Sequence, residues 1–242
     1  MENIILTGDT HGRFLRVKQW CDAHGARQGD ILIVLGDAGI NFYRNAWDDG
    51  LKKLLATLPV TLFCIHGNHE IRPQNIPTYR EEMWHGGVVY VEEEYPNILF
   101  ARDGEIFDLN GQKTLVIGGA YSVDKGRREE GISWWPDEQP SAEIKARVEA
   151  QLERAGWQVD VVLTHTAPIN YEPVDTFLPG IDQSAVDKTT EFFLQSIENR
   201  LTYARWYCGH YHIARTRTTY TEDGKPKGKL RFMFEDYVSF GG

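Results

Sequence analysis

Five short apolar runs are each followed directly by residues of the types that bind metal ions, and this pattern constrains the fold more than any other feature of the chain. The runs cover residues 3–7, 31–35, 60–65, 161–163 and 204–208. Short apolar runs bounded by turn residues are typical of buried β-strands. In an open α/β sheet, ligands bind just beyond the carboxyl ends of the strands. We therefore expect the segments that follow the five runs to meet at one rim of one sheet.

These segments carry carboxylate, amide and imidazole side chains. They read Gly8-Asp9-Thr10-His11-Gly12, Gly36-Asp37, Gly67-Asn68-His69-Glu70, Thr164-His165-Thr166 and Gly209-His210-Tyr211-His212. Asp9 and His11 are two residues apart, as are His210 and His212, and in an extended chain this spacing points both side chains the same way. Mixed carboxylate and imidazole donors suit Mn, Fe, Zn, Co or Ni better than Ca. Each motif alone is weak, but the whole set predicts a two-metal hydrolase.

Hydrophobic patterning predicts the architecture around these segments. The chain has 242 residues, 41% of them hydrophobic, which suits one domain (1–242) with a packed core. Helical patterns at 14–23 and 47–58 alternate with the early strands and predict a parallel sheet with crossover helices. Further strands are expected at 88–91, 98–101, 105–109 and 113–117, helices at 142–155 and 186–201, and a hairpin from 215–221 and 230–234. Together they predict an α/β fold, a two-sheet β-sandwich flanked by helices.

An irregular insertion at about 119–140 interrupts this pattern. It carries Lys125, Arg127, Arg128, Trp134 and Trp135 directly after a predicted strand. Long irregular connections in compact domains are often functional. One hypothesis is that a basic residue contacts phosphate and that a tryptophan stacks on a base or covers the site. The alternative is that the two tryptophans anchor the insertion to the core.

Charge and composition narrow the class of partner. The net charge of −9 argues against binding of duplex nucleic acid, which depends on Lys and Arg to neutralise phosphates. A metal pair would still supply local positive charge for a small anionic substrate. No apolar run reaches eighteen residues, so no membrane span is expected. Three widely spaced cysteines and the lack of a basic-then-apolar start predict a reduced, cytoplasmic protein, and the oligomeric state is left open.

The order of the motifs resembles the calcineurin-like metallophosphoesterase superfamily. Asp-x-His-Gly, Gly-Asp, Gly-Asn-His-Glu, a strand-end His and Gly-His-x-His follow one another from Asp9 to His212. The resemblance implies a β-sandwich flanked by helices, with two divalent or trivalent metal ions, manganese first among them, at one edge. It also implies two ligand sets that share Asp37 as a bridge: Asp9, His11, Asp37 and His212 for one ion, and Asp37, Asn68, His165 and His210 for the other.

The implied chemistry is hydrolysis of a phosphomonoester or phosphodiester by a hydroxide that the metal pair activates. Asp37 and His69 are the candidate catalytic residues, and His69 would stabilise or protonate the leaving oxygen, unless it only hydrogen-bonds the ligand loop. Glu70 would either orient a neighbour or face solvent. The candidate substrate contacts are Asn68, Arg13, Lys125, Arg127 and Arg128. The expected substrate is a small phosphorylated molecule or nucleotide, or else a short single strand of nucleic acid.

Two departures from related families bear on the substrate. Gly-Asn-His-Glu also occurs in protein Ser/Thr phosphatases and diadenosine polyphosphate hydrolases, which carry an Asp-Arg-Gly element in the second motif and an Arg before the third. Here the second motif continues Ala38-Gly39-Ile40-Asn41, and His66 precedes Gly67. A general phosphoesterase is therefore favoured over a protein phosphatase. A nuclease or a nucleotide pyrophosphatase is the second enzyme interpretation. Arg13 or Arg44 would replace the missing phosphate contacts, unless both are ordinary surface residues.

A function of another class is a non-catalytic metal-binding scaffold that presents a protein interface. Loss of metal ligands or of the catalytic histidine would indicate such a scaffold. All the expected ligands and His69 are present in this chain, so an enzyme is favoured.

Overall fold

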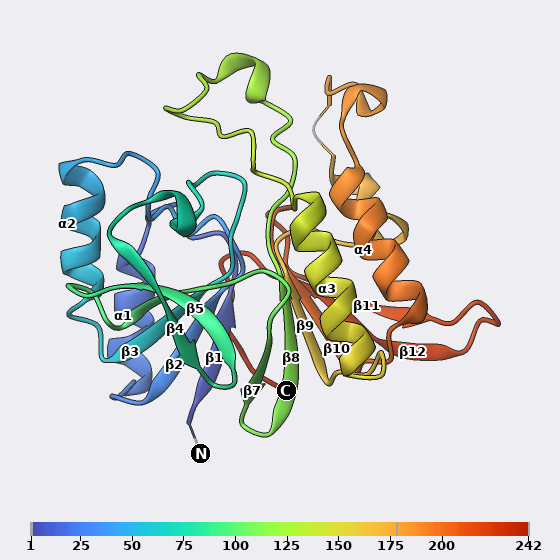
Figure 1. Ribbon diagram of the computed structural model, residues 1–242, viewed down its shortest axis with the longest axis horizontal. Coiled ribbons are helices and arrows are strands. Elements are labelled where there is room, and N and C mark those ends of the chain that lie inside the picture. The colour runs from blue at the N-terminus through green and yellow to red at the C-terminus, as the bar shows by residue number, and fades with distance from the viewer. Residues whose placement is uncertain (1, 178, 242) are drawn as a thin grey trace.

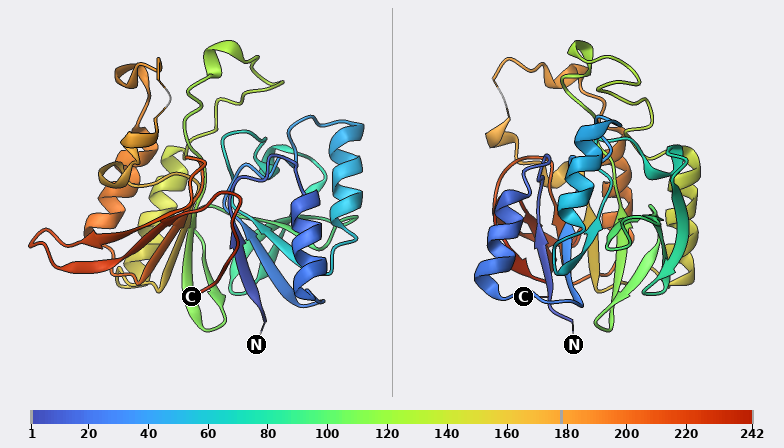
Figure 2. Two further views of the ribbon diagram at one scale, coloured as in Figure 1. Left: turned by 180° about the vertical axis from the view of Figure 1, so that it is seen from behind. Right: turned by 90° about the vertical axis from the view of Figure 1, so that its left-hand side faces the viewer.

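Two β-sheets pack face to face, and two α-helices cover the outer side of each sheet (Figures 1 and 2). The computed structural model describes residues 2–177 and 179–241. No helix in these two ranges combines the length and the apolar character needed to cross a membrane. This architecture is the predicted sandwich flanked by helices.

The first sheet is built from the amino-terminal part of the chain and one carboxyl-terminal strand. Its order is β13 (Val238–Ser239), β1 (Ile4–Thr7), β2 (Asp30–Val34), β3 (Val60–Cys64), β6 (Ile98–Ala101), β5 (Gly87–Glu92) and β4 (Tyr79–Trp84). The four strands from β1 to β6 in this order are parallel, whereas β13, β5 and β4 pair antiparallel. Helices α1 (Leu15–His24) and α2 (Ala46–Leu55) make the first two crossovers, as the alternating pattern predicts.

The strand order of the second sheet is β11 (Arg215–Tyr220), β12 (Pro226–Phe232), β10 (Arg205–Cys208), β9 (Val161–Thr164), β8 (Gln112–Ile117) and β7 (Ile106–Leu109). Hairpins form both of its ends, and the inner four strands are parallel. Asn110 and Gly111 join β7 to β8 with φ of 54° and 81°, the left-handed values that a two-residue hairpin turn needs. Helices α3 (Ala142–Arg154) and α4 (Thr189–Arg200) cover the outer face.

Successive residues of the parallel strands enter different cores. Ile33 and Leu163 point between the sheets, while Leu32 packs under α1 and α2, and Val162 packs under α3 and α4. Because these strands are buried on both faces, nearly every position is apolar, which explains the continuous apolar runs in the sequence.

The five predicted ligand-bearing strands are present as β1, β2, β3, β9 and β10, but they do not belong to one sheet. The first three lie in the first sheet and the last two in the second. The expectation of one rim of one sheet was therefore wrong. A strand pattern reports burial, whereas sheet membership depends on pairing with residues far away in sequence. The loops after both sets of strands instead meet at one edge of the sandwich.

Other differences from the prediction concern element ends and one edge strand. Helix α2 ends at Leu55 rather than 58, and α4 begins at Thr189 rather than 186. The strand Tyr79–Trp84 was not predicted, because it lies at the sheet edge and its exposed positions are mostly charged. Residues 118–141 form the irregular insertion, whose one regular piece is a single 3-10 turn at Lys125–Arg127, and they rise above the edge where the ligand loops meet (Figure 1).

Candidate active site

The ligand-type residues lie in tight turns rather than on extended strand ends. Asp9, His11, Asp37, His210 and His212 have φ of 20°, 46°, 47°, 66° and 52°. Such left-handed conformations cost of order 1–3 kcal/mol each in non-glycine residues and persist where the surroundings hold them, often at functional sites. The prediction that extended spacing aligns Asp9 with His11 and His210 with His212 was therefore wrong. At these residues the chain turns instead of continuing as an extended strand.

Two glycines make room for this packing. A Cβ atom on Gly36 would lie 2.1 Å from Nδ1 of His165, and one on Gly67 would lie 2.1 Å from Oδ1 of Asp37. Both distances are far shorter than any van der Waals contact. Gly36 therefore lets a loop of the first sheet approach His165 of the second, and Gly67 lets two neighbouring loops of the first sheet approach each other.

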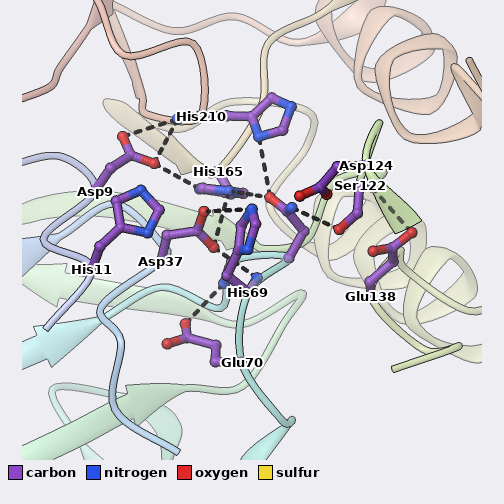
Figure 3. Close-up of polar contacts among 12 residues, drawn as sticks. Asp9, His11, Asp37, His69, Glu70, Ser122, Asp124, Glu138, His165 and His210 are labelled. Atoms are coloured by element: carbon purple, nitrogen blue, oxygen red, sulfur yellow. Dashed lines mark hydrogen bonds and ion pairs between the residues drawn. The ribbon is translucent and has the colours of Figure 1, made fainter. Parts of the chain in front are cut away.

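Three donors form the buried trio of Asp9, Asp37 and His165, which are 2%, 1% and 0% exposed. One ligand atom from each lies within 4.8 Å of the others. Nε2 of His165 lies 3.5 Å from Oδ1 of Asp37, and its Nδ1 lies 2.8 Å from the carbonyl oxygen of Leu35. Donation of the Nδ1 hydrogen to this carbonyl fixes the imidazole ring and turns Nε2 toward the centre (Figure 3).

Asn68 presents its amide oxygen to two imidazoles. Oδ1 lies 2.9 Å from Nε2 of His165 and 3.1 Å from Nδ1 of His210. The amide nitrogen donates to Oγ of Ser122 at 2.8 Å, and the backbone N–H of Ser122 donates to Glu138 at 3.2 Å. The insertion therefore sets the orientation of Asn68. Sequence reasoning missed Ser122 and Glu138, whose position in an irregular segment gives no periodic signal.

The outer pair, His11 and His212, lies nearer to solvent. Their Nε2 atoms are 3.0 Å apart, and Nε2 of His212 lies 4.0 Å from Oδ1 of Asp9. These two histidines and Asp9 form a second group whose donor atoms lie within 4.8 Å of one another. The backbone N–H of His210 donates to both carboxylate oxygens of Asp9 at 3.0 Å and holds that side chain between the two groups (Figure 3).

Without a bound cation, burial limits which groups of this cluster carry charge. Burial raises the pKa of Asp9 to about 8. Burial also disfavours charge on Asp37 and His165, but their mutual attraction prevails: the pKa of Asp37 falls well below its usual range and that of His165 rises to about 9. Burial lowers the pKa of His11 to about 4, so its imidazole is neutral.

Among the described residues, the ion-pair partners of both carboxylates are histidines. Two buried carboxylates surrounded by imidazoles and an amide oxygen fit divalent cations, because a cation compensates the negative charge and uses every one of these donors. The structure thus brings together all seven predicted metal-ligand residues. These residues form the donor cluster: Asp9, His11, Asp37, Asn68, His165, His210 and His212.

His69 lies over the centre with its side chain 25% exposed. Its backbone N–H donates to Oδ1 of Asp37 at 2.9 Å, and its Nε2 lies 3.8 Å from Oδ2 of the same residue. Its ring meets the His11 ring edge-on at 5.6 Å between centroids. The backbone of this residue thus supports Asp37 (Figure 3), while the residue lines both clefts beside the site.

Arg128 reaches the site from the insertion. Asp124 accepts two hydrogen bonds from its guanidinium at 2.8 and 2.7 Å, and the carbonyl of Ser133 accepts a third at 3.0 Å. Its Nη2 lies 3.4 Å from Nε2 of His69. The carboxylate of Asp124 therefore holds this arginine in place beside His69.

The other predicted basic contacts lie elsewhere. Lys125 packs over the rings of Tyr121 and Trp134, at 4.3 and 5.3 Å from their centroids. Arg127 is exposed, and Arg13 is exposed and pairs with Glu235 at 3.8 Å. Arg44 is also exposed. Of these predicted basic side chains, Arg128 is the one whose guanidinium lies within 3.4 Å of His69.

The tryptophans of the insertion contact protein groups. Trp135 is 7% exposed and meets the Phe42 ring edge-on at 5.6 Å. Trp134 is half-buried, with Lys125 over its ring. The geometry of Trp135 supports the anchoring alternative over stacking on a base.

Glu70 is buried at 1% exposure, which excludes the alternative that it faces solvent. Its Oε1 accepts the backbone N–H of Gly67 at 3.0 Å (Figure 3). Burial, with the nearby Asp37 carboxylate, raises its pKa to about 8. Glu70 therefore orients the turn that carries Asn68 and His69.

Two clefts adjoin the donor cluster, and His11 and His69 line both. The α2 cleft, about 610 Å³, is bounded by α2, the 39–43 loop and Arg128. The α4 cleft, about 580 Å³, lies toward the loop before α4 and includes Asp124, Lys188, Glu191 and Tyr211. Both volumes suit small molecules.

Among solved structures, the likeness to one bacterial protein supports the fold. The protein TT1561 of Thermus thermophilus superposes with a TM-score of 0.54 at 11% identity, over 99% of this chain and 98% of that chain. Phosphopantetheinyl hydrolase from Mycobacterium tuberculosis superposes with a TM-score of 0.48 at 17% identity, over 97% and 90% of the two chains. No curated protein matches by sequence. Residues 2–214 match the calcineurin-like phosphoesterase family, and the chain therefore belongs to this family of phosphate-ester hydrolases.

Proposed function

We propose that this protein hydrolyses a phosphomonoester or phosphodiester of a small organic molecule or nucleotide at a centre of two divalent metal ions. The observation that carries the proposal is the convergence of Asp9, Asp37 and His165 in a buried trio without a Lys or Arg ion-pair partner among the described residues. A buried carboxylate pair of this kind needs compensating positive charge.

We assign Asp9, His11, Asp37 and His212 to one ion and Asp37, Asn68, His165 and His210 to the other. The distances between Asp9, His11 and His212, and those among Asp37, Asn68, His165 and His210, support this division. When bound, such a pair supplies a water of lowered pKa and neutralises charge on the phosphate. Manganese is the first metal to test, because it accepts mixed oxygen and imidazole donors.

The protein contributes a preorganised arrangement. Asp9 is held by the backbone of His210, the ring of His165 by Leu35, and the amide of Asn68 by Ser122. Because these groups are already oriented, little reorganisation is needed when the reaction occurs.

His69 and Arg128 take the substrate-facing roles. The His69 side chain lines both clefts, and its Nε2, 3.8 Å from Oδ2 of Asp37, would donate a proton to the leaving oxygen. The guanidinium of Arg128 lies 3.4 Å from this atom and would donate hydrogen bonds to phosphate oxygens. Phosphoryl transfer depends mainly on positioning and charge stabilisation, so these two groups need no protein nucleophile beside them.

The test uses chelator-stripped protein reloaded with Mn²⁺. Hydrolysis of phenyl phosphate and of diphenyl phosphate is compared in wild type, in Asp37→Asn and in the surface control Asp22→Asn, whose side chain is 64% exposed. We expect manganese-dependent turnover that Asp37→Asn removes and Asp22→Asn retains. The preferred ester identifies the monoesterase or diesterase. Bound manganese without turnover of either ester would contradict the proposal.

A further inference from the structure

The α2 cleft opens from His11 and His69 but differs in chemistry from the donor cluster. Its wall consists largely of Phe42, Tyr43, Trp47, Leu51 and Leu54. Glycines at positions 12, 39 and 50 also line it and add no side chains. The result is an apolar, aromatic space of about 610 Å³ next to the proposed catalytic groups.

Several of these wall residues are exposed although they are large and apolar. Trp47, Tyr43 and Leu54 are 77%, 60% and 43% exposed. Trp47, Leu51 and Leu54 are spaced so that they follow one face of α2, a row ~10 Å long at ~1.5 Å rise per residue. Apolar side chains gathered at one place on a surface mark a binding site far more than scattered ones do.

Charge in the cleft is confined to the end near the donor cluster. Asp48 lines the cleft, but it is buried, and its carboxylate accepts the backbone N–H groups of Tyr43 and Arg44 at 3.2 and 2.6 Å. Of the lining residues, Arg128 is the one with a permanently cationic side chain, and it lies beside His69. A second phosphate in the apolar part would therefore meet no counter-charge, which argues against a polyphosphate arm.

One part of the aromatic wall is supported by its neighbours. The rings of Phe42 and Tyr43 meet edge-on at 4.8 Å, and Phe42 in turn packs against the buried Trp135 of the insertion at 5.6 Å. Aromatic side chains on the wall favour a flat ligand, since aromatic rings pack best in stacked or edge-to-face arrangements.

We propose that the α2 cleft binds an uncharged aromatic group of the substrate ester, such as an aryl group or a nucleobase, against Trp47 and Tyr43. This inference rests on the proposed function, because the ester's phosphate would lie at the donor cluster. The continuity of the cleft with His69, its single cationic end and its aromatic wall carry the assignment.

The first experiment measures binding without catalysis. 1-Naphthylmethylphosphonate and n-hexylphosphonate, which have no ester bond to cleave, are titrated calorimetrically into manganese-loaded wild type, Trp47→Ala, Trp47→Phe and Tyr43→Ala. Phe192→Ala, on α4, is the matched control because that aromatic side chain is 63% exposed and lies outside the cleft. We expect Trp47→Ala to weaken naphthyl binding about tenfold, with Trp47→Phe close to wild type and hexyl binding unchanged.

The second experiment measures kcat/KM for 1-naphthyl phosphate and n-hexyl phosphate in the same proteins. We expect Trp47→Ala to raise KM for the naphthyl ester alone, with kcat little changed. Unchanged naphthyl binding in both Trp47→Ala and Tyr43→Ala, or an equal loss for the hexyl ligand, would overturn this inference. Turnover of both esters by those variants would leave the proposed function intact, so the two failures are distinguishable.

Discussion

Two groups within the donor cluster differ in burial. In the buried trio of Asp9, Asp37 and His165, every side chain is enclosed by the sandwich and held by neighbouring loops. In the outer pair of His11 and His212, the imidazoles lie near solvent, with Nε2 atoms 3.0 Å apart. Histidine therefore has two roles here. In the buried trio it is part of the core, whereas in the outer pair it lies where the site opens to solvent.

The largest expected difference between the buried trio and the outer pair is in their contribution to the free energy of unfolding. His165→Ala removes a fully buried ring and leaves the Leu35 carbonyl without its partner, so we expect the free energy of unfolding to fall by about 2–4 kcal/mol. His212→Ala removes an exposed ring and should change it by less than about 0.5 kcal/mol. Urea unfolding of metal-free protein measures both. Similar losses of unfolding free energy in the two variants would show that the buried trio and the outer pair do not differ in this way.

The next contrast concerns orientation of the buried donors. Ser122→Ala removes the acceptor for the Asn68 amide nitrogen and should lower kcat/KM by about 10- to 100-fold, as loss of a ligand-orienting partner typically does. Ser196→Ala, whose hydroxyl bonds only a carbonyl within α4, serves as control. If manganese affinity and kcat/KM both match wild type in Ser122→Ala, the insertion does not position Asn68.

A smaller effect is expected at the turn below His69. Glu70→Ala removes the acceptor for the Gly67 N–H and should cost about 1–2 kcal/mol of stability, whereas Glu70→Gln retains an acceptor oxygen and should lose less. Thermal unfolding of the two variants beside wild type measures the difference. Equal destabilisation by Gln and Ala would show that the carboxyl acts through charge rather than through this hydrogen bond.

The smallest expected effect is a pH dependence of the free energy of unfolding, caused by Glu191 close to the buried trio. Burial raises the pKa of Glu191 to about 7, and its carboxylate accepts a hydrogen bond from Thr166, next to His165. A raised folded pKa stabilises the protein below pH 4.5 or so, and this contribution is lost as pH rises through 7. Glu191→Gln cannot ionise, so its unfolding free energy relative to wild type should increase by about 1 kcal/mol from pH 6.5 to pH 8.5. A pH-independent difference would contradict the assignment.

Much of the fold could be predicted from the sequence, because buried strands and helix faces appear as apolar runs or regularly spaced apolar residues. The five apolar runs became β1, β2, β3, β9 and β10, and the order of their motifs identified the family. The division of these strands between two sheets was not accessible, since it depends on pairing over long sequence separations. The edge strand Tyr79–Trp84 was also missed, because an exposed edge needs few apolar residues.

The predicted ligand residues come together, but the cause is not their spacing along the sequence. Left-handed turns at Asp9 and His210 bring together loops of different sheets. The support from Ser122 to Asn68 and from Asp124 to Arg128 comes from an irregular segment, where residue type gives no indication of direction. Burial of Glu70 likewise depends on how the turn folds under the site.

The hydrogen bonds from His210 to Asp9 join residues 201 positions apart. During synthesis on the ribosome, the amino-terminal motifs emerge long before His165, His210 and His212. Since domains made of distant contacts fold only when the partners are all available, the complete donor set is among the last features to assemble. A nascent or truncated chain can carry Asp9, His11 and Asp37 and still lack a working centre. Catalytic activity of this protein therefore requires that both sheets have folded and packed against each other.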